Sequence, residues 1–408
     1  MAGANIIVGL DIGTTKVAAI IAEWDGAEKP KLIGIGTSPS QGLKRGVVIN
    51  LEKTVESIAS AVEDAEMVAG IKVDSVFAGI AGDHIRSINS HGVIAVSRSD
   101  REITSTDVEK VIEAAKTVAL PMDREIIHVL PQEFTVDDQP GIKDPIGMVG
   151  VRLETEVHIV TGAVTAAQNI YRGVKKAGLE IEDLVLQPLA SSYALLSPDE
   201  KELGVALIDL GGGTADFAIF FDGAIRHTGV VGMGGKNVTN DLAIGLRTPV
   251  DQAEEIKKVY GSAMTSLVDS DEMIEVPAVG GGDPKQISRN VLAAIIEPRM
   301  EEILSLTLQE MKKSSYTDLL ATGVVLTGGG SLLEGVVQLA EKIFDMPVRV
   351  GKPQGLDGLE GNASSPVYAT GIGLILYGLE QIREGKRSGH LKGKGWFHKM
   401  KNMINQHL

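Results

Sequence analysis

The chain has no cysteine among its 408 residues. Disulfide frameworks and thiolate metal sites are therefore excluded, and the absence fits a reducing compartment. The sequence also lacks any uninterrupted apolar run of about 18 residues, the length of a helix that crosses a bilayer. Its first residues carry no apolar stretch of the kind found in signal peptides. Together these absences predict a cytosolic protein.

The charge of the chain is distributed unevenly, with an excess of positive residues only at the C-terminal end. The formal net charge is −15, yet the residues from 383 onward carry seven Lys or Arg and one Glu. That tail therefore has a net charge of +6, and the body before it has −21. An acidic body argues against nucleic acid as the main partner. The length and the 43% hydrophobic content are typical of a soluble protein of roughly two to four domains or subdomains.

Two Gly-rich stretches, 9–16 and 208–216, repeat one Asp-x-Gly pattern far apart in the chain. Apolar, strand-like runs flank each stretch, so each turn is expected to join two strands and not to open a helix as a P-loop does. One such turn alone is more simply an ordinary hairpin, but two facing copies could grip a polyphosphate from both sides. The candidate residues are Asp11, Gly13, Thr14, Thr15 and Lys16 in the first copy, and Asp209, Gly211, Gly212, Gly213 and Thr214 in the second.

The residue types in these turns suit phosphate chemistry. Glycines and small hydroxyl residues let backbone N–H groups approach phosphate oxygens without a Cβ in the way. The carboxylates of Asp11 and Asp209 suit a hydrated Mg²⁺ held against the phosphates. Lys16 adds a point charge for the β- and γ-phosphates.

A third Gly-rich turn, at 324–332, is expected to run from a strand into a helix. Gly328, Gly329, Gly330 and Ser331 could let a nucleoside approach the backbone closely, or they could form a simple tight turn. The sequence leaves both interpretations open.

A helix is predicted at 250–261, and Glu254 and Lys257 stand three residues apart within it. Both side chains therefore project from one face and could contact a ribose or an adenine. An exposed ion pair is the simpler alternative.

Hydrophobic periodicity predicts further helices at 54–69, 105–118 and 286–311. Short alternating runs predict strands at 76–80, 93–96, 126–130 and 157–161. The mixture of short strands and one helix between residues 84 and 162 indicates an α+β insertion between parts of a first lobe.

The order of these segments resembles the nucleotide core of the actin, heat-shock chaperone and sugar-kinase superfamily. Within it the chain resembles the FtsA family, bacterial actin homologues that tether the cell-division ring to the membrane. The resemblance rests on the segments VGLDIGTTK at 8–16, IHVLPQEF at 127–134, LASSY at 189–193, VPAVGG at 276–281 and IEPR at 296–299, and on the basic C-terminus.

The resemblance implies an α/β protein with an actin-like ATPase fold of two duplicated lobes and an α+β subdomain inserted in the first. The implied first lobe comprises 1–83, 163–204 and 367–382, with 84–162 inserted. The second lobe comprises 205–228 and 300–366, with a small subdomain at 229–299. Residues 383–394 would be a flexible linker, and 395–408 a membrane-targeting helix.

The resemblance also implies that ATP and Mg²⁺ bind between the lobes. Gly235 and Lys236 join the candidate nucleotide contacts named above. Gln187 and Asp216 match the positions that orient the attacking water in actin-type ATPases. Members of this family hydrolyse ATP weakly, so the chain is expected to be at most a weak Mg-dependent ATPase.

The last fourteen residues form two faces on a helical wheel. Apolar side chains recur at helical spacing on one face, and a glycine-rich basic linker precedes them. Such a helix can lie in a membrane interface of anionic lipid, while docking on the protein's own core and binding nucleic acid are the alternatives. The candidate membrane residues are Trp396, Phe397, Lys399, Met400, Lys401, Met403, Ile404 and Leu408.

The implied partners follow from the family. The C-terminal peptide of FtsZ would dock in the small subdomain, on a basic helix carrying Lys285, Arg289 and Asn290. The chain would polymerise head to tail and recruit later division proteins at the cytoplasmic face of the membrane, at the division site, without nucleic acid. An ATP-consuming enzyme or chaperone on the same fold, or a pilus-assembly actin homologue, is the alternative.

Overall fold

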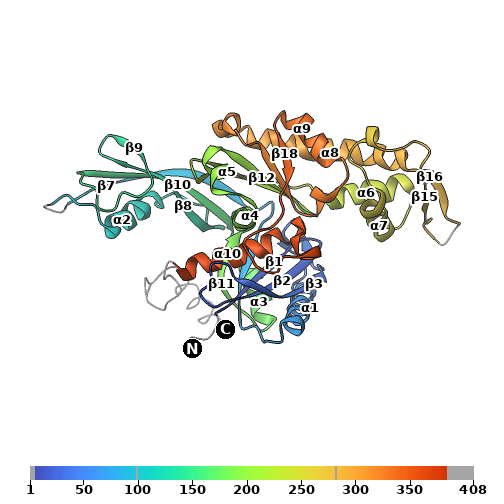
Figure 1. Cartoon of the computed structure of the whole chain (residues 1–408), viewed down its shortest axis with the longest axis horizontal. Helices are drawn as coiled ribbons and strands as arrows, with labels where there is room; N and C mark the ends of the chain where they lie inside the picture. The colour runs from blue at the N-terminus through green and yellow to red at the C-terminus, as the bar shows by residue number, and fades with distance from the viewer. Residues whose placement is uncertain (1–4, 98–99, 281–282, 384–408) are drawn as a thin grey trace.

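The computed structural model describes residues 5–97, 100–280 and 283–383. Two five-stranded sheets form its two lobes, and a four-stranded sheet forms an insertion (Figure 1). In that view the first lobe lies at the bottom, the second at the upper right and the insertion at the upper left. The membrane-helix and linker predictions at 384–408 lie outside the described residues.

The two lobes repeat one sheet topology. The first sheet has the order β11-β6-β1-β2-β3, and the second has the order β14-β13-β12-β17-β18. Each contains an antiparallel hairpin, β1–β2 or β12–β13, with parallel strands added beside its first strand. The strands of the first sheet are β1 (Asn5–Ile12), β2 (Lys16–Trp24), β3 (Lys31–Pro39), β6 (Ser75–Ile80) and β11 (Glu180–Leu186). Those of the second are β12 (Val205–Leu210), β13 (Ala215–Phe221), β14 (Ala224–Val231), β17 (Val324–Thr327) and β18 (Val348–Val350).

Helices cover the first sheet on both faces, which explains why its central strands are almost continuously apolar. Helix α1 packs on β2 and β3, while α10 packs on β1 and on α4. The helices of this part are α1 (Leu51–Ala69), α3 (Val164–Lys176), α4 (Gln187–Leu195) and α10 (Ala369–Arg383). The short sheet beside them pairs β4 (Leu43–Lys44) with β5 (Val47–Val48).

The second lobe carries a helical group around its sheet. Helix α8 packs against β14, α6 and α9, and a separate apolar core runs from β12 to these helices. The elements are α5 (Pro198–Leu203), α6 (Gly235–Leu246), α7 (Val250–Tyr260), α8 (Arg289–Met311), α9 (Val336–Phe344), and the hairpin of β15 (Met273–Val276) and β16 (Lys285–Ser288). Short 3-10 helices lie at η1 (Thr265–Leu267), η2 (Ser315–Leu319), η3 (Gly329–Leu332), η4 (Gly361–Ser364) and η5 (Pro366–Tyr368).

The insertion is an antiparallel sheet, in the order β7-β10-β8-β9, covered by one helix. Its own small core includes Ile103, Val111 and Leu153. The expected α+β subdomain in the first lobe is therefore confirmed. Its elements are β7 (Arg86–Ala95), α2 (Ser105–Ala115), β8 (Arg124–Val136), β9 (Gln139–Ile142) and β10 (Arg152–Ala163).

Several predicted element boundaries are wrong: α1 begins three residues earlier than expected, and α2 ends at Ala115 and not at 118. The long helix expected from 286 begins only at Arg289, because Lys285–Ser288 pairs with Met273–Val276 as a strand. The insertion's strands extend well beyond the short apolar runs that predicted them, since inter-strand hydrogen bonds also recruit polar residues. Among the described helices, none combines the length and the apolar character needed to cross a membrane.

Candidate functional site

A cavity of about 1090 Å³ lies between the two lobes. Both hairpin turns, the start of α4, the faces of α6 and α7, and the loop after β17 line it. The structure places almost all of the predicted nucleotide, metal and catalytic residues in this one wall, and only Gly213 and Ser331 are absent from it. The residues brought together are Asp11, Gly13, Thr14, Thr15, Lys16, Gln187, Asp209, Gly211, Gly212, Thr214, Asp216, Gly235, Lys236, Glu254, Lys257, Gly328, Gly329 and Gly330.

The two hairpin turns face each other closely. Gly13 N donates to Lys16 O at 2.9 Å, and Gly211 N donates to Thr214 O at 3.0 Å, so both turns close in the same way. A Cβ on Gly212 would collide with the side chain of Thr15 in the opposite turn. Glycine is therefore required for the two turns to come this near.

Three carboxylates gather at the base of the cavity. Burial is the main cause that raises the pKa of each of them, and the opposing attraction of Lys16 does not offset it for Asp11. The nearby charges of Asp216 and Asp11 add to burial in raising the pKa of Asp209 to about 7. The pKa of Asp216 rises to about 6. Carboxylates in this state favour a proton or a cation beside them.

Lys16 points along the same wall. Its Nζ donates to Val367 O at 2.7 Å, lies 3.9 Å from Asp11 Oδ2 and sits 4.4 Å from the centre of the Tyr368 ring. Burial lowers its pKa, while Asp11 and Asp209 act to raise it. A buried cation with acidic neighbours is well suited to an anionic ligand.

Of the two predicted catalytic residues, Asp216 is one of these carboxylates and Gln187 lies beside another, Asp11. Gln187, at the first position of α4, donates from Nε2 to Asp11 Oδ1 at 3.1 Å. Asp216 Oδ2 accepts a 2.6 Å hydrogen bond from the hydroxyl of Thr214, and its carboxylate also accepts the backbone N–H of Gly82. The second contact comes from the segment that leads into the insertion.

The opposite end of the cavity is built by α6 and α7. Lys257 Nζ donates to Glu254 Oε2 at 2.7 Å, to Thr239 Oγ1 at 2.8 Å and to Gly235 O at 3.2 Å. Glu254 and Lys257 therefore do share a face and do form an ion pair, inside the cavity wall. Lys236 Nζ reaches across to Thr14 O at 2.9 Å and so connects the two lobes.

The third Gly-rich turn closes this wall. Gly328 has a φ of 79°, and a Cβ there would collide with Asp209 Oδ1. Ser331 Oγ donates to Gly328 O at 2.7 Å, which explains why it braces the turn without lining the cavity. The turn continues into η3 and then α9, as the strand-to-helix prediction expected.

The fit to Mg²⁺ can be judged from these donors. In the described part of the chain, no three His, Cys, Asp or Glu side chains are arranged to hold a metal ion by themselves. Mg²⁺ in nucleotide sites is usually held by one or two carboxylates together with phosphate oxygens and water. Asp11 and Asp209, with raised pKa values and hard oxygen donors, suit that mode of binding.

Several cavity residues were not predicted. Asn240 lies one turn after Lys236 on α6, and Asp251 and Lys258 share the cavity-facing side of α7 with Glu254. Helical periodicity could have identified these three. The backbone of Val367 carries no signal in the sequence, because its position depends on how α10 packs on β1 and α4.

The predicted basic helix for a peptide partner is wrong. Lys285 lies in strand β16, whereas Arg289 and Asn290 begin α8, so the three do not share a helical face. Arg289 instead pairs with Glu272 at 2.9 Å and with Glu334, donates to Tyr260 O at 2.8 Å and lines the cavity.

Comparisons with known proteins point to one family. The family model for cell division protein FtsA matches residues 206–373, and the model for the SHS2 domain inserted in FtsA matches residues 82–161. Cell division protein FtsA of Pseudomonas aeruginosa is 50% identical over 381 residues, covering 93% of this chain and 91% of the relative. Cell division protein FtsA of Escherichia coli is 40% identical over 389 residues, covering 94% of this chain and 92% of the relative.

Solved structures show the same architecture at low identity. The PilM-PilN type IV pilus biogenesis complex gives a TM-score of 0.66 at 16% identity, over 91% of this chain and 98% of the other. MreB5 of Spiroplasma citri bound to ADP gives a TM-score of 0.56 at 15% identity, over 93% of this chain and 98% of the other. The MamK double helical filament gives a TM-score of 0.52 at 12% identity, over 92% of this chain and 98% of the other. These likenesses confirm the expected actin-like ATPase fold.

Proposed function

Because the chain belongs to the FtsA family of cell-division proteins, we propose that it binds Mg-ATP between its lobes and anchors an FtsZ ring to the membrane. In this proposal it polymerises head to tail at the cytoplasmic face of the membrane, at the division site. It also recruits later division proteins.

The observation that carries the proposal is the convergence of three Gly-rich turns and three carboxylates on one cavity. Nothing in the local sequence requires the turns at 13, 211 and 328 to meet, yet the fold places them around the same space. One solved relative in fold, MreB5, holds ADP, which supports a nucleotide as the ligand here.

Different residues would bind different parts of the ligand. Backbone N–H groups of the two hairpin turns and the Lys16 ammonium suit the phosphates, and Asp11 and Asp209 suit Mg²⁺. Bound Mg²⁺ supplies charge neutralisation between phosphate oxygens. Glu254, Lys257 and the turn at Gly328 suit the nucleoside at the other end of the cavity.

Hydrolysis is proposed to be slow and to depend on Gln187 and Asp216. Both can orient a water near the phosphate end, since Gln187 is held by Asp11 and Asp216 by Thr214. A carboxyl with a pKa of about 6 is largely ionised at neutral pH and can accept a hydrogen bond from such a water.

Membrane attachment is proposed to use the apolar stripe of the C-terminal segment, 395–408. One short helix binds reversibly, and head-to-tail assembly multiplies the anchors through effective concentration. The MamK neighbour in fold forms a filament, which supports self-association. The FtsZ peptide is proposed to dock in the subdomain 229–299. Lys285 and Asn290 remain its candidate contacts there, since Arg289 has its donors engaged elsewhere.

The direct test is co-sedimentation with anionic liposomes. We compare the full chain, a version ending at Gly395 and the full-length variant Ile404→Lys, each with and without ATP. Pelleting that needs the tail, is weakened by Ile404→Lys and rises with ATP is expected. Equal pelleting of all three would exclude the membrane role, and independence from ATP would separate attachment from assembly.

A further inference from the structure

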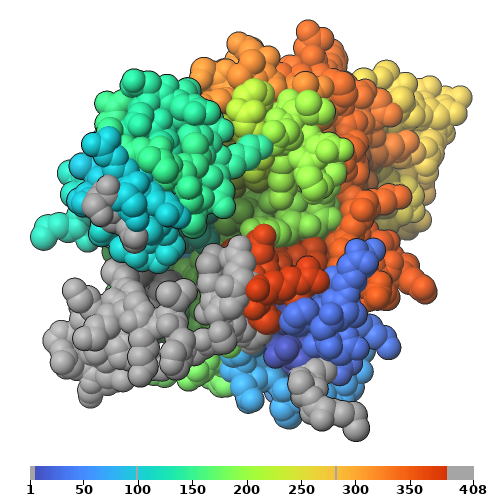
Figure 2. Space-filling view, turned by 60° about the vertical axis from the view of Figure 1, so that its left-hand side comes forward, coloured from blue at the N-terminus to red at the C-terminus, as the bar shows by residue number. Residues whose placement is uncertain are grey.

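The insertion touches the second lobe although both of its covalent connections lead to the first. Strand β7 follows β6, and β10 runs into α3, so the chain enters and leaves through the first lobe. Yet β7, β8 and β10 all pack against β14, the edge strand of the second sheet. Figure 2 shows the teal insertion abutting the lime-green part of the chain. The insertion therefore spans from one lobe to the other.

Each of the three insertion strands contributes at least one side chain to the contact with β14. Ser87 Oγ donates to Thr228 O at 3.1 Å, and Gln132 Nε2 donates to Ile225 O at 2.8 Å. His158 lies 3.0 Å from the hydroxyl of Thr228 through Nε2 and 2.7 Å from Asn89 Oδ1 through Nδ1. Burial lowers the His158 pKa to about 3, so the ring is neutral, with Nδ1 donating to Asn89 and Nε2 accepting from Thr228.

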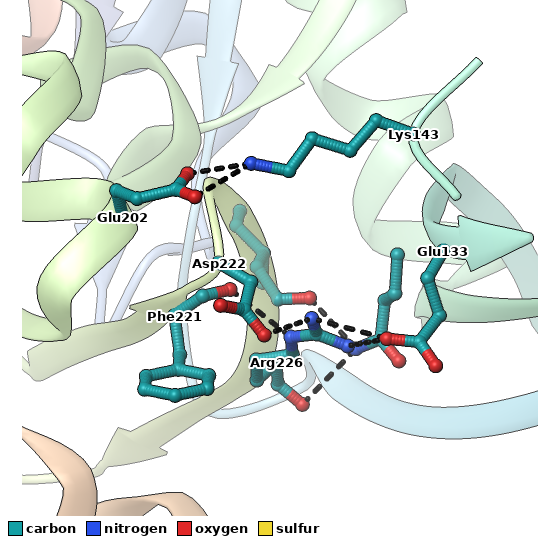
Figure 3. A network of polar contacts seen from close by, with 8 residues as sticks. Glu133, Lys143, Glu202, Phe221, Asp222 and Arg226 are labelled. Atoms are coloured by element: carbon teal, nitrogen blue, oxygen red, sulfur yellow. Dashed lines mark hydrogen bonds and ion pairs between the residues drawn. The ribbon is translucent and has the colours of Figure 1, made fainter. Parts of the chain in front are cut away.

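A group of charged residues completes this contact, and we call it the latch: Glu133, Lys143, Glu202, Asp222 and Arg226 (Figure 3). The Arg226 side chain is only 3% exposed. Its guanidinium lies 3.4 Å from Glu133 of the insertion and 3.3 Å from Asp222 of its own lobe, and its Nε donates to Phe221 O at 3.0 Å. A buried guanidinium that loses one of these partners is costly, because water cannot replace it easily.

The second pair of the latch is exposed. Lys143 Nζ lies 2.6 Å from Glu202 Oε2. Glu202 lies in the last turn of α5, which packs on β13, and its backbone oxygen accepts from Asp222 N at 3.0 Å. Glu202 therefore moves with the second lobe, and both pairs of the latch cross from the insertion to that lobe.

Strand β14 connects the latch to the cavity. Its third residue, Arg226, belongs to the latch, and its last two, Val230 and Val231, pair with Asp216 and Ala215 at the start of β13. Beyond it the chain reaches Gly235, whose N–H donates to Gly211 O at 2.9 Å in the second hairpin turn. At the root of the insertion, Gly82 donates its N–H to the Asp216 carboxylate. The insertion is thus connected to the phosphate end of the cavity in two ways, through β14 at the latch and through Gly82 at its root.

We propose that the insertion is a strap that holds the two lobes at their closed angle, with the latch as its releasable end. Opening the cavity moves the second lobe away from the first and must break the contacts between the latch and β14. Weakening the latch therefore accelerates nucleotide exchange. The inference rests on the proposed function only in taking the ligand to be a nucleotide.

The first test measures the release rate of methylanthraniloyl-labelled ADP from the full chain by stopped flow. Arg226→Met removes the centre of the latch, and Glu133→Gln removes one partner while leaving Asp222 in place. Arg152→Met is the matched control, because its ion pairs with Asp138 and Glu154 stay within the insertion. We expect release about 5-fold faster or more for Arg226→Met, within the usual range of coupling between sites. Glu133→Gln should show a smaller increase and Arg152→Met none; equal rates in all four proteins would overturn the strap.

The second test closes the latch covalently. The natural chain has no cysteine, so Lys143→Cys with Glu202→Cys introduces the only two thiols, both at exposed positions. A short bismaleimide that joins them should slow release relative to the same double variant before treatment, and each single variant should not respond. Unchanged release after complete cross-linking would exclude the strap even if Arg226→Met folded poorly.

A third measurement needs no nucleotide and separates this inference from the proposed function. Spin labels at Met67→Cys on α1 and Ile244→Cys on α6, both highly exposed, report the distance between the lobes. Arg226→Met should broaden and lengthen the distance distribution, whereas Arg152→Met should not. If the wild type binds no labelled ADP, the proposed function fails, and this measurement alone decides the strap. An unchanged distribution would overturn it.

Discussion

The side-chain amide of Gln187 donates a 3.1 Å hydrogen bond to Asp11 Oδ1, across 176 positions of the sequence. The contact joins the start of α4 to the end of β1, in the wall of the cavity. An amide held in this way is oriented before any ligand binds, which is the requirement for positioning a water.

Replacing Gln187 should therefore affect turnover more than binding. Gln187→Ala is expected to lower the ATP hydrolysis rate by about 10-fold or more, since a positioned polar group is lost from the transition state. The dissociation constant for ATP should change little, because the hairpin turns remain. Single-turnover hydrolysis and calorimetry measure the two quantities, with Gln338→Ala on the exposed side of α9 as control. Loss of binding equal to the loss of rate would contradict the assignment.

Removing the second-hairpin carboxylate should abolish Mg-ATP binding. Asp209 lines the cavity near Asp11 and beside Gly328, and it is one of the two carboxylates proposed to hold Mg²⁺. Titration calorimetry of Asp209→Ala should show no heat of binding, whereas Asp64→Ala, on the exposed face of α1, should behave as the wild type. Unchanged affinity in Asp209→Ala would exclude the proposed metal role of this carboxylate.

The same carboxylate predicts how stability depends on pH. The pKa of Asp209 is about 7 in the folded protein against an ordinary value of 3.8, so the folded state keeps a proton that the unfolded chain has lost. The free energy of unfolding therefore falls as the pH rises toward about 7 and levels off above it. For the nucleotide-free protein, the advantage of Asp209→Asn over the wild type should grow by about 2 to 3 kcal/mol between pH 5 and 8.

Denaturant titrations at several pH values measure this difference. His84 and His158, whose pKa values burial lowers to about 4 and 3, are neutral in the folded protein over this range. They affect both proteins alike, so the comparison reports on Asp209 together with its coupling to Asp216 and Asp11. A difference that does not vary with pH would show that the carboxyl titrates at its ordinary value.

Two adjacent glycines should respond differently to alanine. Gly328→Ala places a Cβ against Asp209 at a positive φ, and it should destabilise the protein by about 1 to 3 kcal/mol. Gly329→Ala meets open space and should leave the melting temperature unchanged. Thermal melts without ligand test this contrast. Nucleotide titrations then show whether the open space beside Gly329 belongs to the ligand, because a Cβ there should weaken binding only in that case.

Substitutions of Arg289 and Lys285 should change different properties, the first the stability of the protein and the second its binding of the peptide. Arg289→Ala breaks two ion pairs and a hydrogen bond to Tyr260 O, so it should lower stability by about 1 to 2 kcal/mol. Lys285→Ala, on the exposed hairpin, should keep the melting temperature and weaken binding of the FtsZ C-terminal peptide, as measured by fluorescence anisotropy. Unaltered peptide binding in Lys285→Ala would remove this residue from the proposed contact.

The sequence by itself determined the hairpins and the chemistry of their turns. Asp-x-Gly between apolar runs is a local pattern, because strand propensity and turn geometry act within a few residues. The repetition of that pattern predicted two lobes and a phosphate site, and the loop at Gly328 was recognised by its composition. Gln187 was identified through resemblance, since nothing local marks it, and the role of Asp216 was also implied by resemblance although the residue lies in the second Gly-rich stretch.

Only the tertiary structure decided which distant residues meet. Arg289 looked like part of a basic helix with Lys285, but the pairing of β15 with β16 makes Lys285–Ser288 a strand. Helix α8 therefore begins only at Arg289, whose side chain pairs with Glu272 and Glu334. Arg226 carries no motif, yet its burial between the insertion and the second lobe makes it the centre of a contact between domains. Such roles arise from packing across hundreds of residues, where side-chain partners are set by the shape of the whole fold and not by neighbours in sequence.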